Sequence, residues 1–165
     1  IRSRGVTMFI EPKALYQSPD AATVIPDDFE VPFGKARIRR EGTDMTIITY
    51  GNATHLSLKA ADKLDKEGYS VEVIDLRSLI PLDTELIFKS VKKTNKVLVA
   101  HEDKVHGGFG GEISAMITEK IFEHLDAPVK RVGSLDTPVP FAKELEADFL
   151  PKKRFEEVLL EVVGY

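Results

Sequence analysis

The residues best suited to chemistry lie in one short stretch, where His101 and Glu102 are followed by a glycine-rich bend, GGFGG at 107–111. A bend of this kind between a strand and a helix can present backbone N–H groups to a phosphate. The spacing matches neither G-x-G-x-x-G nor GxxxxGK(S/T), because neither Lys-Ser nor Lys-Thr follows the glycines. We therefore do not predict a nucleotide site here. Tight turns and close packing of the helix explain the glycines better.

The adjacent His101 and Glu102 allow two interpretations. At the carboxyl end of a buried strand, Glu102 could orient or charge His101 or a group of a neighbouring subunit. Alternatively, both residues end the strand and contact a domain interface, which is the interpretation we favour. A metal site that adds Asp103 and His106 is disfavoured, because no further ligand follows at helical or hairpin spacing.

Other catalytic chemistry finds little support in the sequence. The chain has no cysteine, which excludes disulfides, thiolate metal sites and cysteine nucleophiles. No serine lies in a G-x-S-x-G context, so serine hydrolase chemistry is not predicted. Asp75 and Arg77 could form an anion clamp, but an interior salt bridge is the favoured interpretation. The residues alone therefore give no complete active site.

The elements that must position these residues alternate between strands and helices. Apolar runs rich in β-branched residues predict strands, and amphipathic runs between turn residues predict helices. The predicted strands cover 45–50, 71–75, 97–100 and 129–132, with an edge strand in 35–40, and the predicted helices cover 53–67, 83–94, 111–124 and 152–163. This alternation predicts an α/β fold of three layers (αβα) around a mostly parallel sheet of about five strands.

Length and composition limit what the domain can be. At 165 residues, with 42% apolar and 30% charged residues, the chain suits one globular domain. Its net charge of −4 argues against general nucleic-acid binding. No run approaches the ~20 apolar residues of a membrane span, and the first residues resemble neither a signal nor a transit peptide. The lack of cysteine favours an intracellular compartment.

The first residues suggest a fragment of a longer polypeptide. A strand-like run at 6–10 lies so close to residue 1 that its neighbouring strands would be missing. Residues 17–34 are rich in proline and acidic side chains and lack periodicity, so we predict a linker there. The domain itself would cover 35–165, and 1–16 would be the tail of a preceding domain.

Six segments in order carry a family resemblance. They are EPKALY at 11–16, EGTDMTIITYG at 41–51, VEVIDLRSLIPLD at 71–83, VLVAHEDKVHGGFGGEI at 97–113, LDAPVKRV at 125–132 and DTPVPF at 136–141. Over nearly its whole length the chain resembles the carboxyl-terminal part of the beta subunit of a thiamine-diphosphate-dependent 2-oxo acid dehydrogenase. EPK followed by ALY, the GGFG loop and the final Gly164-Tyr165 resemble the branched-chain (2-oxoisovalerate) enzymes more than the pyruvate enzymes.

The resemblance implies a transketolase C-terminal-domain-like fold for 35–165 and makes 1–16 the end of a pyrimidine-binding domain. The complete enzyme would decarboxylate a 2-oxo acid oxidatively and transfer the acyl unit to a lipoyl group. Thiamine diphosphate and magnesium would bind mainly outside this fragment, because the activating helix glutamate of the family has no counterpart here. We therefore assign no catalytic, cofactor-binding or metal-binding residue, and expect the isolated fragment to be inactive.

The resemblance also implies partners and interface residues. The partners would be an alpha subunit or a fused alpha half, a second beta subunit, and the basic subunit-binding domain of the lipoyl acyltransferase core. Asp126 and the chain terminus at Tyr165 match the positions that receive this last domain, although Asp126 could simply be a turn residue before Pro128. His101 and Glu102 would lie near a subunit junction. The location would be the bacterial cytoplasm or, in a eukaryote, the mitochondrial matrix.

Three alternatives stay open. The first is the beta subunit of a pyruvate dehydrogenase. The second is a transketolase-type enzyme such as a deoxyxylulose-phosphate synthase, because DLRSLIPLD at 75–83 and HEDKVHGGFG at 101–110 also fit that wider group. The third is a free-standing interaction module with no enzymatic context.

Overall fold

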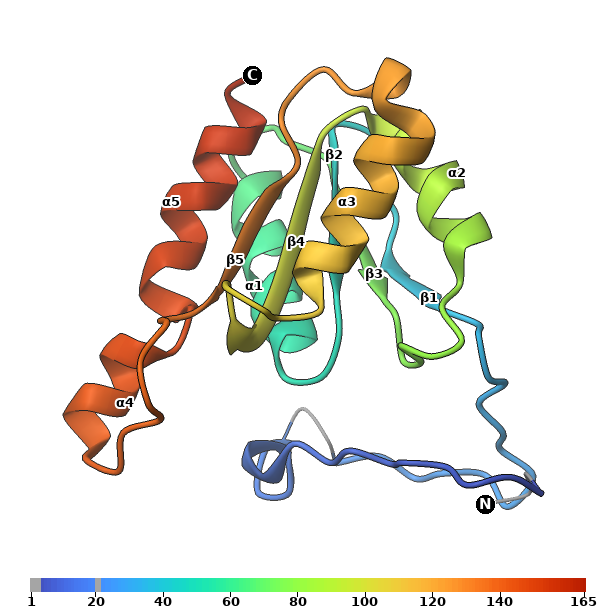
Figure 1. Cartoon of the computed structure of the whole chain (residues 1–165), viewed down its shortest axis with the longest axis vertical. Coiled ribbons are helices and arrows are strands. Elements are labelled where there is room, and N and C mark those ends of the chain that lie inside the picture. Colours follow the sequence, from blue (N-terminus) through green and yellow to red (C-terminus); the bar gives the residue numbers. More distant parts are fainter. Residues whose placement is uncertain (1–3, 20–21) are drawn as a thin grey trace.

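The computed structural model describes residues 4–19 and 22–165, and its body is a five-stranded sheet between two layers of helices (Figure 1). The strands are β1 (Arg37–Arg40), β2 (Met45–Thr49), β3 (Val71–Asp75), β4 (Val97–Lys104) and β5 (Lys130–Ser134). Their order across the sheet is β1-β3-β2-β4-β5. Strand β1 pairs antiparallel with β3, and the other neighbours are parallel.

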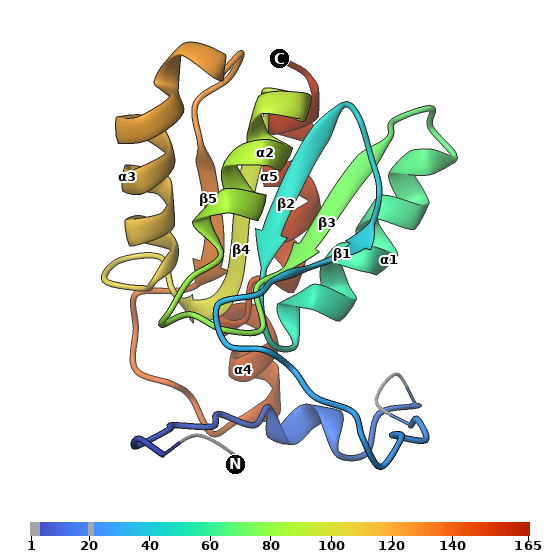
Figure 2. The same ribbon diagram turned by 90° about the vertical axis from the view of Figure 1, so that its right-hand side faces the viewer.

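The helices lie on both faces of the sheet. They are α1 (Ala53–Asp65), α2 (Thr84–Thr94), α3 (Gly110–Ile121), α4 (Lys143–Phe149) and α5 (Lys152–Val163), with short 3-10 turns η1 (Lys13–Leu15) and η3 (Phe122–His124). Helices α1 and α5 cover one face, and α2 and α3 cover the other (Figure 2). The predicted three-layer αβα fold with a mostly parallel sheet is confirmed. No helix in the described ranges is long and apolar enough to cross a membrane.

Each face of the sheet has its own hydrophobic core. In β2, Met45 and Ile47 pack with α1 and α5, whereas Ile48 packs with α2 and α3, and all three are fully buried. Burial on both faces explains why β2 is rich in apolar and β-branched residues and shows no alternation of apolar and exposed polar positions. Phe155 of α5 is the largest fully buried side chain, so the last helix is an integral part of the domain.

The segment predicted at 35–40 forms the antiparallel edge strand β1. Two of its arginines form ion pairs: Arg39 lies 3.4 Å from Asp75, and Arg40 lies 2.8 Å from Asp65. Charged side chains on an edge strand hinder pairing with other chains.

Two predictions about secondary structure were wrong. No strand forms at 6–10, where Val6, Met8, Phe9 and Ile10 are exposed and no strand of the described residues pairs with them. A strand requires hydrogen bonds from a neighbour, which apolar residues alone do not supply. Helix α4 was missed, because the loop around Pro140 was expected to continue to the last helix.

Several boundaries differ from the sequence prediction. Strand β4 continues to Lys104 rather than ending at Ala100, because Lys104 pairs with Ser134 of β5 after a register shift. His101 and Glu102 therefore belong to the strand itself. The helix predicted at 111–124 is α3 followed by the 3-10 turn η3.

The amino-terminal segment lies at the carboxyl ends of the parallel strands, outside the layers (Figures 1 and 2). Its contact with the domain includes Pro12, which lies beside Gly51 of the β2–α1 turn. A second group of contacts holds residues 34–36: Gly34 and Ala36 donate backbone hydrogen bonds to Ser78 and Asp83 at 3.3 and 2.9 Å. The loop after β3 thus fixes the point at which the segment enters the domain.

Candidate functional site

The carboxyl edge of the sheet has a topological switch point between β2 and β4. From β2 the chain reaches β3 through α1 on one face, and from β3 it reaches β4, on the other side of β2, through α2 on the opposite face. Open α/β sheets bind ligands in the crevice at such a point. The residues that line this edge are therefore the first candidates for a functional site.

His101 lies inside this edge rather than on it. Its side chain is fully buried, its ring stacks on that of Tyr50 with centroids 6.0 Å apart and planes 14° apart, and its Nδ1 lies 3.1 Å from the carbonyl oxygen of Asp103. Because a carbonyl oxygen only accepts, Nδ1 carries the proton and Nε2 is unprotonated. Among the described residues, none makes a hydrogen bond with Nε2.

Burial sets the ionisation of both rings. It lowers the pKa of His101 below its ordinary value, and the carbonyl of Asp103 opposes this shift. Burial also raises the pKa of Tyr50 to about 12, with a further contribution from the charge of Asp103. Both rings are therefore neutral at physiological pH, which suits packing better than acid–base catalysis.

Three glycines form the walls of the space that holds the His101 ring. A Cβ on Gly110 would lie 2.3 Å from Nε2, a Cβ on Gly108 would lie 2.9 Å from Cε1, and a Cβ on Gly133 would lie 3.0 Å from Cε1. Any side chain at these positions would overlap the ring. Two glycines of the bend at 107–111 thus serve close packing, as the sequence suggested, and Gly133 of β5 completes the enclosure.

Glu102 joins the two sides of the switch point. Its Oε1 accepts a hydrogen bond of 2.7 Å from Nδ2 of Asn52 in the β2–α1 turn, and its carbonyl accepts one of 2.6 Å from Oγ of Ser134 in β5. The Glu102 side chain is half-buried. It therefore ties β4 to both neighbours.

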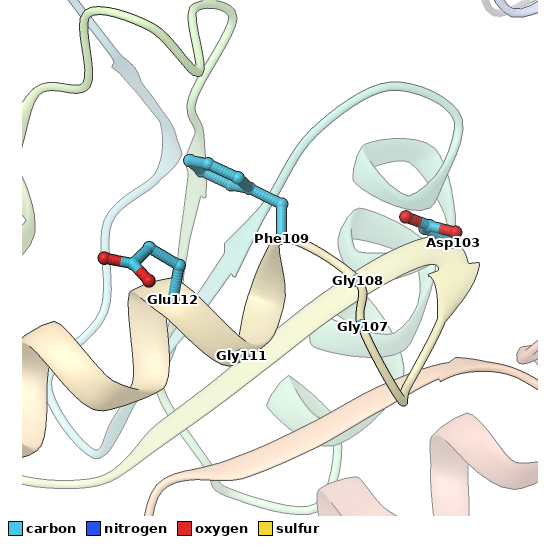
Figure 3. Close-up of a pocket in the computed structure, with 6 residues that line it drawn as sticks. All are labelled: Asp103, Gly107, Gly108, Phe109, Gly111 and Glu112. Atoms are coloured by element: carbon cyan, nitrogen blue, oxygen red, sulfur yellow. The ribbon is translucent and has the colours of Figure 1, made fainter.

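Beside this edge lies an open hollow lined by Asp103, Gly107, Gly108, Phe109, Gly111 and Glu112 (Figure 3). Asp103 lies on one side of the glycines, and Phe109 and Glu112 lie on the other, at the start of α3. Two carboxylates line the hollow without any lysine or arginine. That composition disfavours a phosphate or diphosphate.

The described ranges hold no group of three or more histidine, aspartate or glutamate side chains that could bind a metal ion. In these ranges His101, Asp103 and His106 therefore form no such group. Arg77 also has a structural role: its guanidinium donates to the carbonyls of Lys35 and Ala36 at 2.8 and 3.2 Å. The predicted salt bridge between Asp75 and Arg77 is wrong, because the Asp75 carboxylate pairs with Arg39 at 3.4 Å and accepts only the backbone N–H of Arg77, at 3.2 Å.

We expect the buried His101 to make stability depend on pH. The unfolded chain, in which histidine titrates near 6.5, takes up a proton before the folded chain does, because burial lowers the folded pKa. The free energy of unfolding should therefore fall below about pH 6.5, by at most about 1.4 kcal/mol per pH unit, until the folded pKa is reached. Urea denaturation of wild type and His101→Gln between pH 7.5 and 5 measures this, and equal slopes would contradict it.

The other two predicted site residues lie at the opposite, amino-terminal edge of the sheet. Asp126 follows η3, and its backbone N–H donates to the carbonyl of Asn95 at 2.9 Å. Tyr165 follows α5 and is 58% exposed. Nζ of Lys96, the residue after Asn95, donates to the carbonyl of Val163 at 3.1 Å. One turn, directly before β4, therefore contacts the segments that carry Asp126 and Tyr165.

The structure thus divides the four predicted residues into two pairs, one at each end of β4. Sequence reasoning missed Asn52, the partner of Glu102, although its place directly after a strand and Gly51 was a usable signal. It also missed Gly133 and Lys96. Neither carries a local signal, because their contacts come from elements distant in sequence.

Comparison with known proteins agrees with this geometry. The family model described as "Transketolase, C-terminal domain" matches residues 34–154. The solved structure of a split-gene transketolase, an inactive beta4 tetramer, superposes with a TM-score of 0.72 at 29% identity and covers 87% of this chain and 46% of that chain. A family model and a solved structure therefore both confirm the predicted fold type.

Curated relatives agree with the resemblance drawn from the six segments. The mitochondrial pyruvate dehydrogenase subunit beta-2 of Oryza sativa subsp. japonica is 44% identical over 154 residues, which cover 92% of this chain and 41% of that protein. The 2-oxoisovalerate dehydrogenase subunit beta of Bacillus subtilis is 41% identical over 151 residues, which cover 91% of this chain and 46% of that protein. The chain thus spans less than half the length of these relatives.

Proposed function

Because this chain belongs to the transketolase C-terminal domain family, we propose that it is the terminal domain of the beta subunit of a thiamine-diphosphate-dependent 2-oxo acid dehydrogenase. The observation that carries this proposal is the 41–44% identity to such beta subunits over more than nine-tenths of the chain. The complete enzyme would decarboxylate a 2-oxo acid oxidatively and pass the acyl unit to a lipoyl group. A 2-oxoisovalerate-type substrate fits the EPKALY and GGFG segments, while relatives of both substrate classes are similarly close.

The cofactor would be held by other parts of the enzyme. Diphosphate recognition calls for cationic side chains or a metal ion, yet the hollow beside α3 is lined by Asp103 and Glu112. The described residues also lack a metal-binding cluster. Since these residues do not fit thiamine diphosphate and magnesium, we derive no catalytic step from this chain. Its proposed role is assembly and docking.

The carboxyl edge is the proposed junction with other parts of the enzyme. The amino-terminal segment at this edge exposes Phe9, Ile10 and Phe29, among other apolar side chains. Large exposed apolar patches mark interaction surfaces. Glu102, which is half-buried and bonded to Asn52, lies at the same edge. An alpha subunit, or a second beta subunit, would cover these groups, and the domain would contribute a preformed surface with His101 packed beneath it.

The opposite edge is the proposed docking surface for the basic subunit-binding domain of the acyltransferase core. We call the surface formed by Asp126 and Tyr165 the docking rim. Both residues are exposed, and so are Glu123 and Glu161 nearby along the chain, of which Glu161 forms an ion pair with Lys130. The exposed carboxylates of Asp126 and Glu123 suit a basic partner, because complementary charge raises the association rate and fixes the register of the complex.

Reversing the charge of Asp126 tests the docking proposal. In the complete recombinant enzyme, Asp126→Lys should weaken binding of the purified subunit-binding domain at least about tenfold, or about 1.4 kcal/mol, chiefly at low salt. The control is Glu85→Lys, the same reversal at a 90% exposed side chain of α2 on the other edge. Calorimetric titration at low and physiological salt measures both. Unchanged affinity for Asp126→Lys would refute the docking proposal.

A transketolase-type enzyme is a second candidate, because a solved split-gene transketolase superposes with a TM-score of 0.72. Such an enzyme would act on sugar phosphates and would need no lipoyl partner. The same titration separates the two candidates, since a transketolase would not bind the subunit-binding domain. For either candidate we propose a location in the bacterial cytoplasm or the mitochondrial matrix, and the rice relative is mitochondrial.

A further inference from the structure

The turn between α2 and β4 contacts both segments of the docking rim. Asn95 ends α2 in the left-handed conformation, with φ 60° and ψ −5°. This conformation is uncommon for residues other than glycine, and asparagine tolerates it better than most. From it, the Asn95 carbonyl accepts the backbone N–H of Asp126 at 2.9 Å, and Nδ2 donates to the carbonyl of His124 at 2.7 Å. Asn95 therefore holds the turn that carries Asp126 through two hydrogen bonds.

The next residue, Lys96, reaches the other segment of the rim. Its half-buried side chain donates to the carbonyl of Val163, in the last turn of α5, at 3.1 Å. The last carbonyls of a helix lack intrahelical partners and carry partial negative charge, so an ammonium group is favourable there. Tyr165 follows two residues later. Lys96 thus anchors the end of α5 from which Tyr165 extends.

We propose that Asn95 and Lys96 are positioning residues of the docking rim, and that they hold Asp126 and Tyr165 in a fixed relation before the partner binds. This inference rests on the proposed docking function. Preorganisation of an interface lowers the ordering cost of association and slows dissociation. Neither residue need touch the partner. The two are adjacent in sequence, so any shift of this turn moves both halves of the rim together.

Because Lys96 is charged, positioning and long-range electrostatics predict opposite changes in the affinity for the partner when this lysine is neutralised. A lysine near the docking rim repels a basic partner, so long-range electrostatics alone predicts tighter binding when Lys96 is neutralised. Positioning predicts the opposite result, because the end of α5 loses its anchor. Lys92, an exposed lysine in the last turn of α2, offers a matched loss of charge without a bond to α5 among the described residues.

The experiment measures binding of the purified subunit-binding domain to the complete enzyme by surface plasmon resonance. Lys96→Met should weaken the affinity about three- to tenfold through faster dissociation, whereas Lys92→Met should leave it unchanged or slightly tighter. Lys96→Arg, which can still donate to Val163, should restore most of the affinity. Unchanged or tighter binding by Lys96→Met would overturn the proposal, as would a failure of Lys96→Arg to restore it.

Asn95→Gly provides a second test that does not depend on charge. Glycine keeps the left-handed conformation and the carbonyl that accepts from Asp126, but it loses the bond to His124. We expect a two- to fivefold weaker complex with an unchanged salt dependence, and wild-type affinity would count against positioning.

Asp126→Lys is run in parallel. If it binds normally, docking itself has failed; if it binds weakly while Lys96→Met and Asn95→Gly bind normally, only the positioning proposal has failed.

Discussion

Replacing Gly110 with alanine is expected to lower the free energy of unfolding by about 3 kcal/mol. The new Cβ would lie 2.3 Å from Nε2 and 2.5 Å from Cδ2 of His101, and 3.3 Å from Cγ1 of Val99. The ring cannot move away, because Gly108 and Gly133 enclose it and its Nδ1 bonds to the carbonyl of Asp103. The added methyl group must therefore displace the start of α3 from β4.

Gly111 provides the matched control for this substitution. A Cβ there would meet Nη1 of Arg131 at 3.3 Å, and this Nη1 donates to the carbonyl of Val105 at 3.0 Å in an exposed hydrogen bond that water can replace, so the tip of the side chain can shift at little cost. Alanine is a better helix former than glycine by about 1 kcal/mol, so Gly111→Ala should be neutral or slightly stabilising. Urea denaturation monitored by circular dichroism compares the two variants.

A double variant keeps this prediction testable if Gly110→Ala alone does not fold. His101→Ser removes the ring that the new methyl group would strike, so the combination with Gly110→Ala should be more stable than the sum of the single effects predicts. The loss of unfolding free energy in the double variant should be smaller than the sum of the two single losses by at least about 1 kcal/mol. Additive losses, or a wild-type stability for Gly110→Ala, would contradict the enclosure around the ring.

The alternation of strands and helices could be predicted because its signals are local. Apolar runs with β-branched residues, Asp83 before α2 and Gly68 after α1 mark most elements in the sequence itself. The errors arose where pairing between segments distant in the sequence decides whether a strand forms. Among the described residues the apolar run at 6–10 has no strand to pair with, while the polar end of β4 becomes a strand because Ser134 lies opposite Lys104.

The candidate site was predictable only in part, for the same reason. The rule that polar residues gather at the carboxyl edge of a parallel sheet identified His101 and Glu102. It could not reveal that His101 points inward, since the enclosure needs Gly133 from β5. Similarly, Asp126 and Tyr165 are distant in the sequence, and their link through Asn95 and Lys96 depends on the order of the strands.

Replacing Lys93 with methionine is the second change for which we expect a large effect, a loss of about 3 kcal/mol at neutral pH. Glu72 of β3 is fully buried, and its carboxylate accepts hydrogen bonds from Ser90 Oγ and Lys93 Nζ. Burial raises the pKa of Glu72, and the ammonium group of Lys93 opposes that rise. Without Lys93, a buried carboxylate is left uncompensated. We expect the lower end of the usual 3–5 kcal/mol because the Lys93 side chain is 39% exposed to screening solvent.

The pH dependence of this loss identifies its cause. In Lys93→Met the folded pKa of Glu72 lies further above the unfolded value of about 4.5. The loss should therefore be smallest below that pH and should grow as the pH rises through the folded pKa. Adding Glu72→Gln to Lys93→Met removes the unpaired charge and keeps an acceptor for Ser90, so the double variant should recover most of the lost stability. The control Lys92→Met should cost less than about 0.5 kcal/mol. If Lys93→Met and Lys92→Met unfold at the same urea concentration, Glu72 does not need its partner, and the hydroxyl groups around it suffice to hold the carboxylate.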